Sequence, residues 1–182
     1  PTAIPMSRAL WTVLEVDVSK HPESSVGQRW WAFVVSYCVV WLGAAAVLAS
    51  AQLGLATVDA PLSGPLSAAV GLVAAGAYQF SSLKMRCLTG CTRPMTFLLA
   101  HWREGISGAA SLGMRHGLHC VGCCWVLMSV ALIGGLHSLP VMAAVTIVMV
   151  VEKLPSVGET IRVPVGLLLV AAGGVTLVGA LT

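Results

Sequence analysis

The sequence predicts an all-α fold, a polytopic membrane helix bundle with about five transmembrane helices in this chain. Hydrophobic residues make up 57% of the 182 residues, charged residues make up only 9%, and the mean hydropathy is +0.90. Such a composition is far too apolar for a soluble domain of this size. Long apolar segments recur along the chain, and the basic residues gather between them. All three observations favour helices in a bilayer.

The chain opens with a segment that we expect to lie at the membrane surface rather than to cross it. Residues 1–27 mix charged side chains with scattered aliphatic ones, which is typical of an interfacial or amphipathic lead-in. The first predicted span, Gln28–Leu53, is long enough to cross roughly 30 Å of hydrocarbon. Trp30 and Trp31 stand where interface anchors are expected. Residues 28–182 are predicted to form a single transmembrane helical domain.

Four further spans are predicted, each set off by polar or turn-forming residues. Asp59–Pro65 forms a turn before the second span, and the polar stretch Lys84–Arg115, broken by Pro94, is expected to lie largely at the interface. The fourth span is short, so we expect Glu152 and Lys153 to extend it by snorkelling toward water. These four spans are Leu66–Leu83, Gly113–Ile133, Leu139–Val151 and Val163–Leu181.

The distribution of basic residues predicts which way the bundle faces. Lys and Arg gather in the lead-in, in Lys84–Arg115 and in the Glu152–Arg162 loop, and five crossings put these three stretches on one side. That side is expected to be the cytoplasm, because basic loops stay there. The Asp59 loop, the His137 turn and the C-terminus carry no basic residue and are expected to face outward. The sequence therefore predicts a multi-pass protein of the cell inner (cytoplasmic) membrane.

The stretch His-Gly-Leu-His-Cys-Val-Gly-Cys-Cys holds two imidazoles and three thiols within nine residues of an apolar span. In a helix these side chains share an arc of roughly 140°, so all of them can face one neighbour. Thiolate and imidazole donors favour Cu(I), Zn(II) or an iron–sulfur centre, whereas Ca(II) and Mg(II) require oxygen ligands. Polar groups inside a bilayer usually mark a site. The candidate metal ligands here are His116, His119, Cys120, Cys123 and Cys124.

Two more candidate ligands, Cys87 and Cys91, lie one helical turn apart just after the second span. If the second and third spans are neighbours, these thiols meet the third-span donors near the cytoplasmic face. The combined set exceeds the four donors of a tetrahedral site, which permits several sites or a transfer path. Met114 and Met128 add thioether sulfur, which favours copper over zinc.

Cys38, His101 and Arg115 are not counted among the candidate ligands. Cys38 stands alone and is expected to pack as a small apolar side chain. His101 is followed by Trp102 and is expected to rest at the membrane interface. Arg115 either neutralises a multi-thiolate site or anchors its helix to lipid phosphate.

Several of these residues together resemble a known family. They are Tyr78-Gln79, Leu83-Lys84, Cys87-Leu88, Cys91, Arg93-Pro94, Gly113-Met114-Arg115-His116-Gly117, Cys120-Val121-Gly122-Cys123-Cys124-Trp125 and Leu127-Met128. From about Tyr37 to Leu169 the chain is similar to an uncharacterised prokaryotic family of predicted metal-binding integral membrane proteins, with its specific Gly-Cys-Cys-Trp core. The resemblance implies a multi-helix membrane protein with a thiol-rich site. It also implies a hydrophobic helix upstream of a bend like that of Pro1–Met6, and an aromatic residue where His119 stands.

The leading functional prediction is an integral membrane metal-binding accessory protein that holds or transfers a soft metal. Copper is favoured, with zinc or an iron–sulfur centre as alternatives. The expected partners are the lipid bilayer and the subunits of a larger membrane complex, to which this chain would be auxiliary. A haem-attachment motif is absent from the sequence.

Two other functions stay open. A membrane redox protein would exchange disulfides between Cys120–Cys123 and Cys87 or Cys91 and pass electrons to quinone. A purely structural subunit of a membrane complex would use its thiols for packing alone. The sequence has no phosphate loop, Ser-His-Asp set or paired carboxylates, which favours a role other than enzyme. Its basic residues lack aromatic interleaving, which argues against a nucleic-acid partner.

Overall fold

The computed structural model describes residues 9–15, 25–57, 64–133, 139–154 and 157–181, and this part of the chain is helical with no strand. A short helix over residues 9–15 comes first. It is followed by α2 (Val26–Thr57), α3 (Pro65–Gln79), α4 (Ser82–Thr92), α5 (Pro94–His101), α6 (Gly105–Ile133), α7 (Leu139–Glu152) and α8 (Gly158–Leu181). The predicted all-α class is confirmed. The Asp59 loop, the His137 turn and Pro1–Met6 lie outside the described residues.

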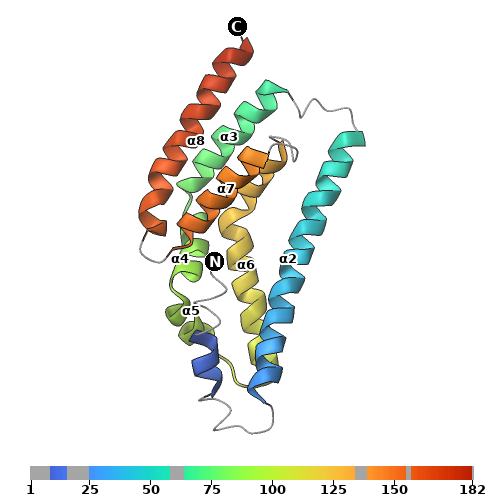
Figure 1. Cartoon of the computed structure of the whole chain (residues 1–182), viewed down its shortest axis with the longest axis vertical. Coiled ribbons are helices and arrows are strands. Elements are labelled where there is room, and N and C mark those ends of the chain that lie inside the picture. The colour runs from blue at the N-terminus through green and yellow to red at the C-terminus, as the bar shows by residue number, and fades with distance from the viewer. Residues whose placement is uncertain (1–8, 16–24, 58–63, 134–138, 155–156, 182) are drawn as a thin grey trace.

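Helix α6 is the central element of the bundle (Figure 1). It packs along α2 on one side and against α3 and α4 on the other, while α8 packs along α3. Small residues make the closest approach possible, because a Cβ at Gly113 would stand 2.3 Å from the Phe33 carbonyl oxygen and 2.3 Å from Ser36 Oγ. The arrangement holds α4 beside the middle of α6, where the candidate ligands lie.

The predicted span Leu66–Leu83 is broken in the structure. Helix α3 ends at Gln79, and α4 begins at Ser82 after a bend of 65°. Ser81 causes the new start, because it is extended and its hydroxyl accepts from the Lys84 amide at 3.1 Å, as an N-cap does. The break turns α4 away from α3 and carries Cys87 and Cys91 with it.

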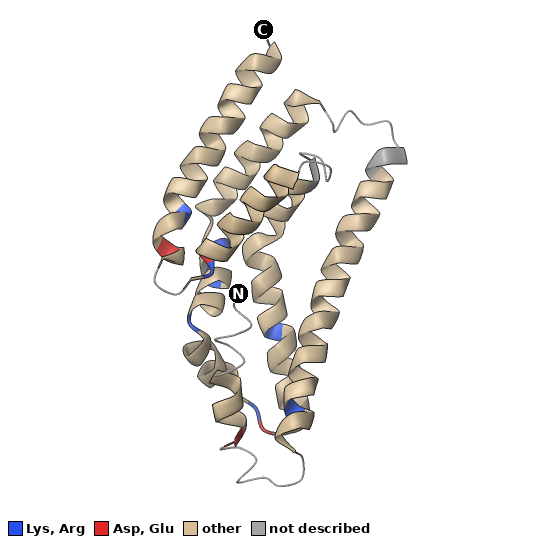
Figure 2. Ribbon diagram, in the orientation of Figure 1, with Lys and Arg blue, Asp and Glu red and all other residues tan. Residues whose placement is uncertain are grey.

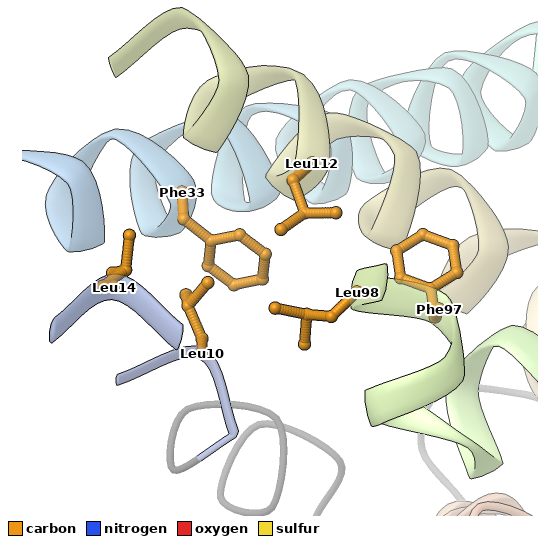
Figure 3. Close-up of a cluster of buried hydrophobic side chains, with 6 residues drawn as sticks. All are labelled: Leu10, Leu14, Phe33, Phe97, Leu98 and Leu112. Atoms are coloured by element: carbon orange, nitrogen blue, oxygen red, sulfur yellow. The ribbon is translucent and has the colours of Figure 1, made fainter. Parts of the chain in front are cut away.

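The end of the bundle near α5 is closed by an apolar cluster (Figure 3). Its buried members are Leu10, Leu14, Phe33, Phe97, Leu98 and Leu112. They come from the helix at residues 9–15 and from α2, α5 and α6, so part of the predicted lead-in packs onto the bundle. Phe97 extends from this cluster to the candidate site, where its ring centroid lies 5.4 Å from that of His116.

Two of the described helices are long and apolar enough to cross a membrane, Val26–Gly54 and Gly158–Leu181. The bent pair of α3 and α4 makes a third if it forms one span. Helix α7 is apolar but shorter, which agrees with the short fourth span of the prediction. Length and composition are therefore compatible with a membrane protein, and the count of five crossings stays a prediction.

Candidate metal centre

Two helices bring the predicted thiols together. Cys87 and Cys91 belong to α4 and the others to α6. Cys91 Sγ lies 3.3 Å from Cys120 Sγ, although the two residues are 29 positions apart in sequence. The predicted meeting of the two groups of thiols is confirmed. We call this set, Cys87, Cys91, Cys120, Cys123 and Cys124, the thiol cluster.

Gly122 allows α4 and α6 to approach at the thiol cluster. A Cβ at Gly122 would stand 2.7 Å from Cys87 Sγ, so only glycine leaves room for this sulfur in its present place. The hydroxyl of Tyr78 on α3 donates to the Gly122 carbonyl at the same turn. Side chains from α3 and α4 therefore both contact the α6 backbone at Gly122.

The thiol cluster is buried in an apolar shell. The exposed fractions of Cys120 and Cys123 are 0% and 2%, and Cys87 is half-buried. The thiols of Cys123 and Cys124 donate to the Cys120 carbonyl oxygen at 3.1 and 3.0 Å. Thiols are weak donors, so a soft metal that binds the sulfur replaces only weak bonds. The surrounding side chains are Tyr37, Trp41, Leu88, Met128 and Met149.

His116 adds an imidazole to the thiol cluster. Its Nε2 lies 3.6 Å from Cys120 Sγ, and its side chain is 2% exposed. The ring packs against Phe33 and Tyr37, with centroid distances of 6.2 and 5.8 Å. Its Nδ1 is buried with no hydrogen-bond partner, which is uncommon for a polar atom in a protein interior. His116 therefore lies in contact with the thiol cluster, and its role as a ligand stays a prediction.

Over residues 1–176 the sequence matches the family described as PpoB2, copper chaperone. The chain belongs to this copper chaperone family. A comparison with curated proteins and another with solved structures matched nothing. Membership supports a copper-related accessory role and agrees with the metal-related family that the sequence resembles.

A copper chaperone carries its metal as cargo. In this structure the side chains of the thiol cluster are not arranged as they would be around a bound metal ion. Within the described ranges, no group of three or more His, Cys, Asp or Glu side chains is arranged to hold a metal ion. Two sulfurs that share a tetrahedral metal at roughly 2.3 Å lie roughly 3.8 Å apart. The Cys91 and Cys120 sulfurs, at 3.3 Å, would part slightly on loading, and Cys123 and Cys124 would rotate away from the backbone carbonyl that they now bond.

A buried ionic network lies next to the thiol cluster, and its pairing was not visible in the sequence. Lys84 Nζ on α4 lies 2.7 Å from Glu152 Oε2 at the end of α7. Gln79 Nε2 donates to the other carboxylate oxygen at 2.7 Å, and Arg162 donates to the Gln79 carbonyl oxygen at 2.6 Å. We call Gln79, Lys84, Glu152 and Arg162 the ionic network. It ties α3, α4, α7 and α8 together.

Lys153 supplies positive charge to the thiol cluster. Its ammonium lies 5.6 Å from the centroid of the Trp41 ring. Burial acts to lower the pKa of Lys153, but Cys124 and Cys123 act against it through the negative charge that each carries once deprotonated, and the pKa is raised overall. Arg115, which the sequence offered for this role, is exposed. The only sequence signal for Lys153 was its place at the end of a short apolar span.

The remaining residues of reactive types lie apart from these contacts. Cys38 on α2 is exposed rather than packed as the sequence predicted, and it belongs to neither cluster. His119 contacts Phe97 and His101, with ring centroids 5.1 and 6.5 Å away. The sequence placed His101 at the interface and gave no sign of this pairing, because His101 lies on a separate helix.

Proposed function

We propose that this protein is an integral membrane copper chaperone that holds Cu(I) in the thiol cluster and passes it to a larger membrane enzyme. The observation that carries the proposal is the contact of Cys91 with Cys120 across α4 and α6. Soft thiolate ligands select Cu(I) over hard cations, and the apolar shell keeps competing water away. Family membership supports copper over zinc or an iron–sulfur centre.

The surplus of donors supports a transfer function. The thiol cluster and His116 together offer more ligands than one tetrahedral ion takes. A metal held by some of them can therefore exchange ligands one at a time, without passing through a bare state. Half-buried Cys87 is the thiol through which copper would leave, since the other members are buried.

The charge distribution supports a membrane location with the thiol cluster toward the cytoplasm. In Figure 2 the charged residues lie in the lower and middle parts of the bundle, whereas the described upper parts of α2, α3, α7 and α8 have none. Such a charge-free layer is what hydrocarbon requires. We assign the basic side to the cytoplasm, with five crossings and with the lipid bilayer and subunits of a membrane complex as partners.

Replacing two thiols tests the copper proposal. The Cys120→Ser/Cys123→Ser variant is expected to bind Cu(I) at least roughly tenfold more weakly, because loss of a ligand costs at least what loss of an outer-shell partner does. The measurement is copper per chain in detergent-purified protein, in reducing buffer against a competing chelator. Cys38→Ser is the matched control and keeps wild-type copper, because that thiol is exposed on α2. A doubly substituted protein with native helix content and undiminished copper contradicts the proposal.

The sulfur separation of 3.3 Å also favours a redox candidate. In that reaction the thiols of Cys91 and Cys120 form a disulfide, and their two electrons and two protons reduce a quinone to a quinol. Metal-free protein would then reduce quinone, and Cys91→Ser would abolish the reaction. Quinone reduction by protein that binds no copper would replace the chaperone proposal with this one.

A further inference from the structure

A pair of imidazoles lies beside the thiol cluster. His101 ends α5 and His119 lies on α6, and their ring centroids are 6.5 Å apart. Phe97 contacts both rings, at 4.6 Å from His101 and 5.1 Å from His119. Both histidines are half-buried, whereas Cys120 is 0% exposed. The pair is therefore more accessible than the thiol it adjoins.

Backbone contacts fix the same tautomer in both rings. His101 Nδ1 lies 3.0 Å from the Phe97 carbonyl oxygen, and His119 Nδ1 lies 2.9 Å from the Arg115 carbonyl oxygen. A carbonyl oxygen can only accept, so each Nδ1 carries the hydrogen and each Nε2 keeps its lone pair. Donation of the second ring N–H to a backbone carbonyl is the usual arrangement of metal-binding histidines. Both rings are thus prepared to bind through Nε2.

Gly90 leaves room for the His119 ring to lie against α4. A Cβ at this position would stand 2.8 Å from His119 Cδ2, the ring carbon next to Nε2. Gly90 directly precedes Cys91, and His119 directly precedes Cys120, whose sulfurs are in contact. His119 is consequently the member of the imidazole pair that adjoins the thiol cluster along α6.

The spacing of the two rings suits one shared metal. A metal at roughly 2.0 Å from an imidazole nitrogen lies roughly 3 Å from the ring centre, so two rings on one metal have centres at most roughly 6.5 Å apart. The observed 6.5 Å equals this upper limit, which two rings reach when their Nε2 atoms face each other across the ion. Two protein ligands leave positions open for water or for a ligand of the donor molecule, as a transit site requires.

We infer that His101 and His119 form a second copper site, an imidazole pair that receives the metal and passes it to the thiol cluster. Imidazole binds copper, but thiolate is the softer ligand and binds Cu(I) in preference, so transfer runs from the histidines to the cysteines. The direction of transfer rests on the proposed function. The existence of the site does not, because its two Nε2 atoms bind metal whether or not the thiols do.

Asparagine substitutions isolate the role of the Nε2 atoms. Asn at position 101 or 119 retains an N–H near the place of Nδ1 and removes Nε2. We expect His101→Asn and His119→Asn each to slow Cu(I) uptake from a competing chelator at least roughly tenfold, and the final copper content to stay at the wild-type value. The double variant should be no slower than either single one, because one metal needs both rings. His119→Phe keeps a ring between Gly90 and Phe97 and serves if an Asn variant does not fold.

Ni(II) binding tests the site independently of copper, in protein that lacks two of the thiols of the thiol cluster. In the Cys120→Ser/Cys123→Ser background, calorimetry should detect Ni(II) binding that is lost on adding His119→Asn, since imidazole binds Ni(II) well. Unchanged Ni(II) binding in that protein overturns the site. Loss of Ni(II) binding with unchanged Cu(I) uptake overturns its role in loading. If only the proposal that the thiol cluster holds Cu(I) is wrong, the Cys120→Ser/Cys123→Ser protein keeps its full copper content. Its Ni(II) binding through the two histidines is then still present.

Discussion

The thiol cluster and the ionic network are both buried and both include residues of α4, but they are bonded in opposite ways. In the ionic network both carboxylate oxygens of Glu152 accept at 2.7 Å, from Lys84 and from Gln79. In the thiol cluster the contacts of Cys120 with Cys91 and with His116 are 3.3 and 3.6 Å, between groups that are weak hydrogen-bond partners. In the first region two short bonds to the Glu152 carboxylate hold the helices together, although Gln79 Oε1 and Arg162 Nε are buried without a partner. The second has donors that are free to change partner.

The comparison predicts the largest stability loss where the buried Lys84 ammonium loses its carboxylate partner. Glu152→Leu would leave the Lys84 ammonium buried without a counter-charge, at a cost of about 3–5 kcal/mol. The side chains of this pair are only 0% and 3% exposed, so water cannot take over. Unfolding in detergent, followed by circular dichroism, measures the loss.

The double variant Lys84→Met/Glu152→Leu is the matched control. It removes both charges and should recover most of the lost stability, because apolar side chains of similar volume often replace a buried pair without loss. Equal losses in the single and double variants would show that the pair contributes through packing and not through its charges.

Two glycines of α6, Gly113 and Gly122, allow packing and copper binding to be tested separately. At Gly113 an added Cβ meets the backbone of α2, whereas at Gly122 it meets only the sulfur of Cys87, which can rotate. Gly113→Ala is expected to cost about 1–3 kcal/mol by forcing two helices apart. Gly122→Ala is expected to be nearly neutral, since alanine favours helix by about 1 kcal/mol over glycine.

Copper binding should change in the reverse order. Gly122→Ala displaces Cys87 and is expected to weaken copper binding, while Gly113→Ala leaves the ligands of folded protein in place. Thermal unfolding and chelator competition on the same two proteins give both numbers. Weakened copper binding in Gly113→Ala with no change in Gly122→Ala would contradict the assignment of Cys87 to the site.

Periodicity and composition were enough to predict the parts of the site that lie on one helix. His116, Cys120 and Cys123 all lie on the buried side of α6 because 3.6 residues per turn bring them there, and α6 is continuous through them. The apolar runs predicted α2 and α8 for the same local reason. The meeting of α4 with α6 was predicted only on the condition that the two spans were neighbours, and the contact of Cys91 with Cys120 fulfils it.

What the sequence could not give depends on contacts between distant segments. Lys84 and Glu152 are 68 residues apart, and each looks locally like a residue at the end of a span. The break after Gln79 depends on Ser81 acting as a helix cap, whereas an apolar run alone favours continuing the span. His101 pairs with His119 because the turn from α5 to α6 folds back at Gly105, where φ is +79°.

The smallest effect is expected at an exposed ion pair that has nearly the same geometry as the buried one. Arg93 and Glu159 lie 3.1 Å apart, with side chains 60% and 39% exposed. Glu159→Gln should therefore change the free energy of unfolding by only about 0–1 kcal/mol, and added salt should erase the difference, because water already solvates both charges. Unfolding at two salt concentrations measures it. A loss as large as that of Glu152→Leu would mean that burial is not what distinguishes the two pairs, and the contrast between the ionic network and the thiol cluster would have to rest on sulfur chemistry alone.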